Sequence, residues 1–403
     1  DLHLFLQEAY EAVAERVEHW DEKTQNGTAQ IDEQALHQEL RGYLKPLLLL
    51  TTDYPAVAMN PPYMGSRQMN GELKSYVKEH YPDSKRDLFA VFMEVGEEKT
   101  QAAGRLGMIN QQSWMFLSSY EDLRKHVLDT LLIESMLHMG PNTFDEISGE
   151  VVQSTSFVLQ NTLPQGRTGT YFRLVDESSS TAKKEAFRSG AHRHGGVEQQ
   201  NFEKIPGTPI AYWADSRLTM RFSELPYLSE IAPPRKGFDP GGGSKKYFRQ
   251  WYEVRVHDFY RGDGKPVDYK WILFNKGGGG ERWFGDRKFI VFKGVDKDGL
   301  YEKDGANIRN KSDYFKPGIT YSVISSKAPN FRITNKEYIF YQHGANCIVD
   351  QKDKRYYLLA LLNSPVSEYA LEVINPTLSF TVGDVGKIPI YTPKEGGGNI
   401  TDL

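Results

Sequence analysis

The chain has 403 residues, 39% hydrophobic and 25% charged, which suits roughly two or three soluble domains with ordinary cores. Its single cysteine, Cys347, excludes a disulfide framework and a cysteine-built zinc site, and fits a reducing cytoplasm, where we expect the protein. No run is long and apolar enough to span a bilayer, and we expect neither a secretory leader nor a membrane partner.

The first 50 residues form a helical lead-in. Residues 2–20 place apolar side chains at helical spacing, and a second helix is expected around residues 34–47. The chain begins with Asp1 and opens directly on this helical pattern, so we expect it to be a piece of a longer chain.

Residues 51–178 alternate between predicted strands and helices, which favours an α/β domain with a mostly parallel sheet and closing strands that can pair antiparallel. Strands are predicted up to Met59 and over 105–110, 133–140, 154–159 and 169–175, with helices near 86–99 and over 120–129.

The rest of the chain has a different pattern. Residues 179–200 are polar and small, and we interpret them as a linker or flexible loop. Residues 201–403 contain short strand-like runs and a helical stretch at 356–374, which predicts a separate α+β domain. Three glycine runs lie outside any strand-loop-helix phosphate motif and are interpreted as loops, with shortened connections as a second possibility: 241–243, 277–280 and 396–398.

The net charge of −4 is unevenly distributed. Residues 1–50 hold 10 acidic and 4 basic side chains, whereas residues 235–316 hold 19 Lys or Arg against 12 Asp or Glu, together with 17 aromatic side chains. Basic side chains interleaved with aromatic ones suit phosphate neutralisation and stacking on bases. A charged sheet face over an aromatic core would have the same composition, and the sequence leaves both interpretations open.

One short motif ends the first strand of the α/β region. In "VAMNPPYMGS", two prolines follow Asn60, and neither Pro61 nor Pro62 has an N–H to donate, so the strand must stop there. Open α/β sheets bind ligands at the carboxyl ends of their strands. The sequence therefore predicts a catalytic loop of Asn60, Pro61, Pro62 and Tyr63, with a stiff turn as the plainer alternative.

Such a loop suits a specific chemistry. The exocyclic amine of a purine is a poor nucleophile because its lone pair is delocalised into the ring. The amide oxygen of Asn60 and the carbonyl oxygen of Pro61 can accept its two N–H bonds, which frees the lone pair and stabilises the positive charge that grows on nitrogen. The ring of Tyr63 can stack on the base.

At these residues the chain resembles the amino-methylating DNA methyltransferases, whose motif is Asn/Asp-Pro-Pro-Tyr/Phe. The resemblance implies S-adenosylmethionine as cofactor and the catalytic half of a Rossmann-like class I methyltransferase sheet. In "DSKRDLFAVFMEVG", Leu88 and Phe92 would border the adenosine of the cofactor. In "LHMGPNTFDEISGEVVQSTSFVLQN", Phe144 would cover the second face of a flipped base.

A narrower resemblance covers about residues 50–390. "NPPYMGSRQMN", "QQSWMFLSSYEDLR", "FNKGGGGERWFG" and "LLNSPVSEYALEVINPTLSFTVGDVGKIPI" are similar to the PglX family, the adenine-specific methyltransferases of BREX phage-defence systems. The resemblance implies double-stranded DNA as partner, with other BREX proteins or a phage inhibitor as further partners, and residues 201–403 as a target-recognition domain. The family's glycine-rich cofactor motif has no match in residues 1–56.

Six basic side chains follow the glycine loops of this domain and are the predicted DNA contacts: Lys245, Lys246, Arg249, Arg282, Arg287 and Lys288. Other candidates are weaker. We expect His192 and His194 to be loop residues, His343 and Cys347 to be core residues, and Asp215 and Asp384 to cap helices or turns. No metal site is expected.

Three functions remain open after this reading. The leading one is site-specific transfer of a methyl group to the exocyclic amine of a flipped-out adenine in DNA, in bacterial phage defence. The second is a DNA-recognition module that is catalytically incomplete, which the missing glycine motif favours. The third is an amine methyltransferase acting on protein, which the recognition-like domain disfavours.

Overall fold

A computed structural model describes residues 5–15, 31–144, 152–241, 247–262, 265, 268–285, 287–292, 307–324, 330–377 and 379–392. The chain divides into two compact units. Unit 1 is Asp1–Trp114 with Asp122–Gln199, and unit 2 is Met115–Glu121 with Gln200–Leu403.

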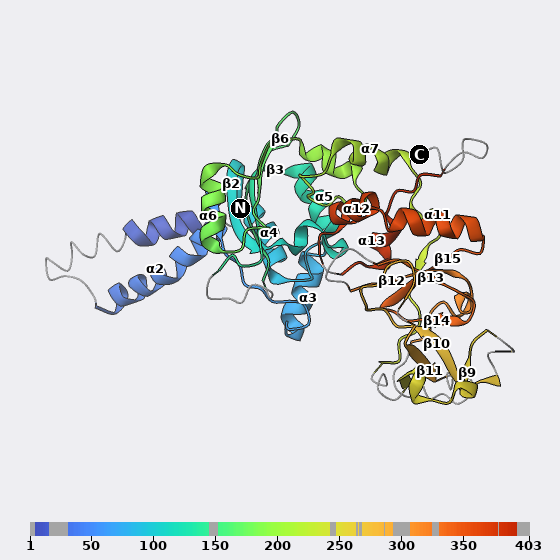
Figure 1. Ribbon diagram of the computed structural model, residues 1–403. Coiled ribbons are helices and arrows are strands. Elements are labelled where there is room, and N and C mark those ends of the chain that lie inside the picture. Colours follow the sequence, from blue (N-terminus) through green and yellow to red (C-terminus); the bar gives the residue numbers. More distant parts are fainter. Residues whose placement is uncertain are drawn as a thin grey trace. The chain divides into compact units, whose positions relative to one another are not determined.

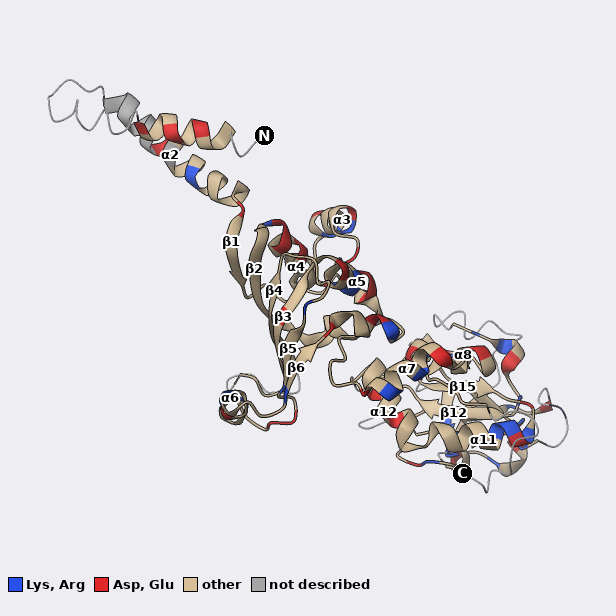
Figure 2. Cartoon of the chain, turned by 90° about the horizontal axis from the view of Figure 1, so that it is seen from above, with Lys and Arg blue, Asp and Glu red and all other residues tan. Residues whose placement is uncertain are grey.

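Unit 1 is built on a six-stranded sheet (Figure 1), and its strand order β1-β2-β4-β3-β5-β6 can be followed in Figure 2. Its strands are β1 Tyr54–Met59, β2 Thr100–Gln111, β3 Leu132–Gly140, β4 Ser154–Gln160, β5 Gly169–Arg173 and β6 Arg193–Val197. The pairs β1/β2 and β3/β5 are parallel, and β4 and β6 pair antiparallel with their neighbours. β1, β2, β3 and β5 therefore run in one direction, but three of the five strand pairs are antiparallel, so the sheet is mixed rather than mostly parallel. The inserted strand β4 accounts for two of these pairs.

The helices of unit 1 include two that the sequence did not predict, α3 and α6. Residues 5–15 are helical, and the others are α2 Ile31–Thr51, α3 Gly71–His80, α4 Leu88–Glu98, α5 Glu121–Thr130 and α6 Ser180–Ser189. α3 begins where the Asn70 side chain accepts a hydrogen bond from Leu73 N, an ordinary N-cap. Charged side chains gather on helices such as α3 and α5, while the strands are mostly neutral (Figure 2).

Helix α4 packs against β1 and β2 through a glycine. A Cβ atom on Gly96 would overlap the side chains of Met59 and Leu106. On the same helix, Phe89, Ala90 and other apolar side chains are buried. The strand that carries the Asn-Pro-Pro-Tyr motif is thus held directly against the helix that follows the motif.

Residues 179–200 do not form a linker, contrary to the sequence prediction. Ser179 caps α6 by accepting from Ala182 N at 3.2 Å, and Gly190 ends it in a left-handed conformation with φ 73°. β6 then pairs with β5 along four residues. The prediction was wrong because it used composition alone, although Ser179 and Gly190 are standard start and stop signals on either side of a ten-residue helix.

Unit 2 is α+β, as predicted. Its five-stranded sheet has the order β14-β10-β11-β8 with β9 beside β10, and its four-stranded sheet has the order β13-β12-β15-β7. The strands are β7 Pro234–Arg235, β8 Phe248–Gln250, β9 Phe259–Tyr260, β10 Trp271–Asn275, β11 Phe289–Phe292, β12 Gly318–Ser322, β13 Arg332–Thr334, β14 Tyr338–Phe340 and β15 Gly344–Ile348.

Helices pack on the four-stranded sheet and form with it a large core of unit 2, which includes Leu358, Leu371 and Val385. They are α8 Leu228–Ile231, α11 Lys352–Leu362, α12 Pro365–Ile374 and α13 Val382–Gly386. α7 Ser216–Glu224 belongs to a second core, which it shares with α12. The predicted helical stretch at 356–374 is interrupted at Ser364, because Pro365 starts α12 at its first turn and Ser364 caps it. Short 3-10 helices are η1 Gln112–Met115, η2 Ser118–Tyr120, η3 Gln199–Lys204, η5 Trp251–Glu253, η6 Val256–Asp258 and η8 Lys311–Asp313.

Many aromatic side chains of residues 235–316 belong to a core. Phe238, Tyr247 and Phe274 are buried in one cluster on the five-stranded sheet, with Phe248 and Phe289 packed against it. The aromatic excess of this stretch therefore comes in large part from a hydrophobic core, which is the second of the two interpretations left open above.

No helix in the ranges that the structure describes combines the length and the apolar character needed to cross a membrane.

Candidate active site and DNA-contacting surface

The Asn-Pro-Pro-Tyr loop directly follows β1 at the carboxyl end of the sheet. Because β1, β2, β3 and β5 run in the same direction, their carboxyl ends lie along one edge of unit 1. This edge collects Asn60 after β1, Gln112 after β2 and the segment 141–144 after β3. Catalytic and ligand-binding residues of open α/β sheets are commonly found at such an edge.

Asp87 fixes the far end of the loop. Its Oδ1 accepts hydrogen bonds from Met64 N at 2.9 Å and from Phe89 N at 3.3 Å. A backbone hydrogen bond joins the same two segments, since Leu88 N donates to Met64 O at 3.1 Å. A single carboxylate therefore caps α4 and holds the residue that follows Tyr63.

Some side chains of the loop are packed against the protein, and others are exposed to solvent. Pro61 is buried, while Asn60 is exposed and its amide makes no hydrogen bond with any residue that the structure describes. Tyr63 is half-buried, and its ring meets the ring of Phe89 edge-on at 6.0 Å between centroids. The amide of Asn60 is thus open to an incoming polar group beside an oriented aromatic ring.

Burial shifts the pKa values of Asp87 and Tyr63. It raises the pKa of Asp87 above its ordinary value, against the effect of the amide hydrogen bonds from Phe89 and Met64, which lower it. Burial also raises the pKa of Tyr63, and the negative charge of Asp87 adds to that shift. Tyr63 therefore stays a neutral phenol at physiological pH, as a residue that stacks needs to be.

Leu88 and Phe92 lie on the first turns of α4, immediately after this corner. Leu88 is buried in a cluster with Met69, Val77 and Val91, and Phe92 is packed against the same cluster but only half-buried. Phe92 can offer part of its ring to a ligand, whereas Leu88 contributes mainly to the core.

Phe144 is 37% exposed and follows β3. β1 and β3 are separated by β2 and β4, which places their axes three strand spacings apart, or about 14 Å. Tyr63 and Phe144 can therefore face one base only if both loops lean toward each other above β2 and β4. Their role as a stacking pair stays a prediction, and residues 145–151 lie outside the described part of the chain.

The structure adds a buried polar cluster that the sequence reading missed. His138 Nε2 lies 2.7 Å from Gln112 Oε1, and Gln112 also donates to Gln153. Asn110 lies across from Thr155 and is fully buried, and its side-chain oxygen and nitrogen have no hydrogen-bond partner among the described residues. A buried amide without partners costs about 1–3 kcal/mol, and such costs need an explanation in a native fold.

This cluster lies at the carboxyl ends of β2 and β3, between the Asn60 loop and the segment that holds Phe144. Burial lowers the pKa of His138 to about 3, with nearby positive charges acting in the same sense, so the imidazole is neutral at physiological pH. In the sequence, the only trace is the polar run "NQQS" after an apolar strand, which reads equally well as a surface turn.

The predicted DNA contacts of unit 2 have varied surroundings. Arg249 is half-buried and donates to its neighbour Phe248 O at 2.7 Å, and Arg282 forms an ion pair with Glu368 at 3.1 Å. The guanidinium of Arg287 lies 3.7 Å from the centroid of the Phe284 ring. Lys288 is exposed. Lys245 and Lys246 lie outside the described residues, and a DNA-contacting role for the whole set stays a prediction.

The glycine loop before Arg282 is held by a buried arginine. Arg332 is 2% exposed, and it donates to Gly278 O at 3.0 Å and to Ser322 Oγ at 3.1 Å. Further along the loop, Trp283 N donates to Phe331 O at 2.9 Å and Trp283 O accepts from Ile333 N at 2.9 Å. Trp283 is 51% exposed and has φ 73°, so backbone bonds hold an exposed aromatic residue in a strained conformation.

Most of the weaker candidates are structural, but the prediction that His343 is a core residue was wrong, since its side chain is exposed. Asp215 caps α7 and Asp384 forms a capping box with Thr381, as predicted. Cys347 is buried in the main core of unit 2, and burial raises its pKa to about 12.

Two histidines are surface residues of the α6–β6 region. His192 is exposed and ends 3.3 Å from Glu177 Oε1, and His194 lies on β6 rather than in a loop. Among the described residues, no group of three or more His, Cys, Asp or Glu is arranged to hold a metal ion.

Comparisons with known proteins agree with this arrangement. The Eco57I restriction-modification methylase family matches residues 2–144. In solved structures, the DrdV–DNA complex matches with TM-score 0.53 and 12% identity over 89% of this chain and 44% of that chain. The type IIL restriction-modification enzyme MmeI, in complex with DNA, matches with TM-score 0.51 and 11% identity over 83% of this chain and 45% of that chain. These likenesses show the fold, which is that of restriction-modification methyltransferases.

Curated relatives are closer in sequence. The adenine-specific methyltransferase BrxX of Escherichia coli O9:H4 (strain HS) is 39% identical over 87% of this chain. The adenine-specific methyltransferase PglX of Lacticaseibacillus casei (strain Zhang) is 35% identical over 90% of it. The chain spans 29% and 31% of the lengths of these two relatives. The resemblance predicted from the sequence is therefore confirmed: this chain is homologous to one segment of the PglX and BrxX adenine-specific methyltransferases.

Proposed function

We propose that the chain carries the catalytic loop and the DNA-reading part of an adenine-specific DNA methyltransferase. Its substrate is the exocyclic amine of an adenine that has left the duplex, and its setting is phage defence of the BREX kind in the bacterial cytoplasm. The observation that carries this proposal is the position of Asn60, with an exposed and unbonded amide, at the carboxyl end of β1. The names of the relatives, which say adenine-specific methyltransferase, support it.

The loop can activate the amine without a dedicated base. Asn60 Oδ1 and Pro61 O accept the two N–H bonds, which keeps the nitrogen lone pair available and stabilises positive charge on it during transfer. These acceptors need a fixed geometry, which the two prolines supply on one side. The Asp87 bond to Met64 N supplies it on the other. The ring of Tyr63, oriented by Phe89, stacks on the base.

S-adenosylmethionine would supply the electrophilic methyl group. The residues present fit one side of it, since the half-buried ring of Phe92 can lie against an adenosine beside Leu88. The glycine-rich turn that would cradle the rest has no counterpart in residues 1–56, where the only glycines are Gly27 and Gly42. The chain is therefore proposed to contribute one wall of the cofactor site.

Adenine in a duplex must flip out to reach this loop, at a cost of a few kcal/mol. Phosphate contacts that set the register on DNA are proposed to come from unit 2, where Lys288 is exposed. Lys245 and Lys246 are proposed to add to these contacts.

The test replaces the proposed acceptor. In the full-length protein, Asn60→Ala should lower methyl transfer to DNA by on the order of a hundredfold or more, because a preorganised acceptor for the transition state is lost. Asn60→Asp is the matched control: it keeps an oxygen acceptor at the same position and should retain more activity than the alanine variant. Binding of a DNA duplex should be nearly unchanged in both. Near-normal methylation by Asn60→Ala would refute the proposed mechanism.

A further inference from the structure

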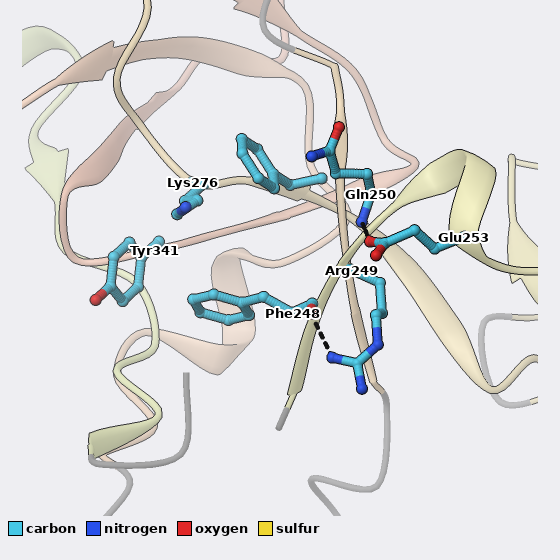
Figure 3. Close-up of a pocket in the computed structure, with 7 residues that line it drawn as sticks. Phe248, Arg249, Gln250, Glu253, Lys276 and Tyr341 are labelled. Atoms are coloured by element: carbon cyan, nitrogen blue, oxygen red, sulfur yellow. Dashed lines mark hydrogen bonds between the residues drawn. The ribbon is translucent and has the colours of Figure 1, made fainter. Parts of the chain in front are cut away.

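Unit 2 contains a cavity of about 310 Å³ at one end of the five-stranded sheet (Figure 3). Four strand ends meet there. Gln250, the last residue of β8, pairs with Phe289, the first residue of β11. The carboxyl ends of β10 and β14 pair through Asn275 and Phe340. The cavity thus lies at a common edge of β8, β11, β10 and β14, which are joined only by long connections in the sequence.

Three of the lining side chains, those of Phe248, Gln250 and Phe289, share one face of this sheet. Gln250 and Phe289 are paired directly, and Phe248 lies two residues before Gln250 on the same side of the pleat. This is the face that carries the buried aromatic cluster of the five-stranded sheet. The cavity is therefore the open end of a hydrophobic core, where rings are packed on one side and accessible on the other.

Aromatic rings provide the apolar surface. Phe248, Phe289 and Tyr341 are each half-buried, and each packs against the cluster that contains Phe274. The rings of Phe248 and Tyr341 meet edge-on, with centroids 5.7 Å apart. A planar aromatic ligand finds several ring surfaces here that are already oriented by packing.

Charge at the cavity is of mixed sign with a positive excess. Lys276 places its Nζ 4.2 Å from the centroid of the Phe289 ring and makes no ion pair with any described residue. Glu253 is already engaged, because its carboxylate accepts from Gln250 N. In Figure 3, Lys276 and Tyr341 lie at one end of the cavity and Glu253 at the other, while the Arg249 guanidinium turns toward Phe248 O. Lys276 is thus the cation that a ligand can reach.

We propose that this cavity binds one nucleotide, with the base against the rings of Phe248, Phe289 and Tyr341 and a phosphate near Lys276. Stacking on aromatic side chains is sequence-tolerant and strong for every base. Cavities of about 300 Å³ are at the small end of ligand sites, which suits a single nucleotide rather than a longer segment. The cavity belongs to unit 2 and the loop of Asn60 to unit 1, and the proposed occupant is a nucleotide other than the adenine to be methylated.

The nucleotide has two conceivable sources, a base of bound DNA or a free mononucleotide. The first rests on the proposed function, in which unit 2 contacts DNA. Both have the same chemistry at the cavity, a planar base attached to a phosphate, and the arms of one experiment separate them.

The experiment uses the full-length protein and three variants. Lys276→Met removes the charge and keeps the aliphatic stem, while Phe289→Leu removes a ring. Lys352→Met is the matched control, because Lys352 also lies over an aromatic ring, that of Tyr356 at 6.0 Å, away from the cavity. The probes are a random-sequence DNA duplex, followed by fluorescence anisotropy, and deoxyadenosine monophosphate and deoxyadenosine, followed by ligand-observed NMR.

The expected results differ by variant and probe. Phe289→Leu should weaken binding of base-containing probes by about 5- to 150-fold, the loss expected for one stacking contact. Lys276→Met should weaken the monophosphate but leave the nucleoside unchanged, and on the duplex it should lower the salt slope by about one unit. Lys352→Met should change nothing. A loss on the duplex alone assigns the site to DNA, and a loss on the monophosphate alone assigns it to a free nucleotide.

The proposal is overturned if Lys276→Met binds the duplex and the monophosphate as the wild type does, or if Lys352→Met loses as much. Phe289 contributes to a core, so Lys276→Met decides the matter if the leucine variant does not fold. If the wild type binds no duplex, the proposed function fails. Binding of deoxyadenosine monophosphate to the wild type and to Lys276→Met still tests the cavity in that case.

Discussion

Removal of the Asp87 carboxylate tests whether one side chain holds the Asn-Pro-Pro-Tyr loop. In Asp87→Ala, α4 loses the N-cap acceptor of Phe89 N. Met64 N, in the residue next to Tyr63, loses its hydrogen-bond partner as well. Asp87→Asn is the control, because an asparagine Oδ1 caps a helix as well as an aspartate does and can still accept from Met64 N. Since burial raises the pKa of Asp87, its charged form is held at a cost that asparagine avoids.

The size of the effect follows from two lost bonds. Replacing an N-cap by alanine costs about 1 kcal/mol. A half-buried amide left without an acceptor adds roughly 1 kcal/mol or more. The two changes share one carboxylate, so a total of about 2 kcal/mol is expected for Asp87→Ala and close to zero for Asp87→Asn.

Hydrogen exchange and methyl transfer measure the two consequences separately. Amide exchange at Met64 and Phe89 should be faster in Asp87→Ala by a factor on the order of 30, the equivalent of about 2 kcal/mol. It should be unchanged in Asp87→Asn. Methyl transfer by the full-length protein should fall in the alanine variant only, because Asn60 and Tyr63 lose their fixed geometry. Equal exchange and equal activity in the two variants would refute the tether.

The remaining predictions concern four sites. The pKa of His138 is lowered to about 3, so below pH ~6.5 the unfolded chain binds a proton that the folded chain does not bind. The free energy of unfolding should therefore fall by up to about 1.4 kcal/mol per pH unit down to pH ~3. Urea unfolding of His138→Gln should lack that slope. Gly277→Ala should destabilise unit 2 more than Gly278→Ala, since both have positive φ but only a Cβ at Gly277 would overlap the His343 carbonyl; equal thermal midpoints would contradict this. Tyr63→Ala and Phe144→Ala should each impair methylation of a mismatched adenine less than that of a paired one, because a mismatched base flips more easily; equal losses on the two duplexes would argue against flipping.

In unit 1, local sequence rules predicted where β1 ends and where α4 lies. The prolines of the motif end β1 because they cannot continue a ladder, and the predicted helix near 86–99 is α4. The same kind of local rule, applied to Ser179 and Gly190, would have found α6. Helix α3 was missed because its cap, Asn70, directly follows a loop with no apolar period.

Other features depend on pairing over long distances and had no local signature. Asn110 and His138 lie in one cross-strand row only because β4 pairs with both β2 and β3, with Thr155 opposite each of them. The cavity of unit 2 likewise needs β8 to pair with β11, and β10 with β14. Composition in residues 235–316 could not separate a core from an accessible surface, because Phe248 and Phe289 pack against the core and also line the cavity.

In the glycine loop held by Arg332, the contacts that fix the backbone path do not involve the exposed aromatic side chains. Its anchors are the carbonyl of Gly278 and the backbone of Trp283, and none of them uses the side chains of Trp283 or Phe284. Those two side chains are exposed, so they can be exchanged while the path of the loop is kept. A surface built in this way can acquire a new contact by one substitution without refolding, and a lineage under pressure to change what it recognises could vary these positions first.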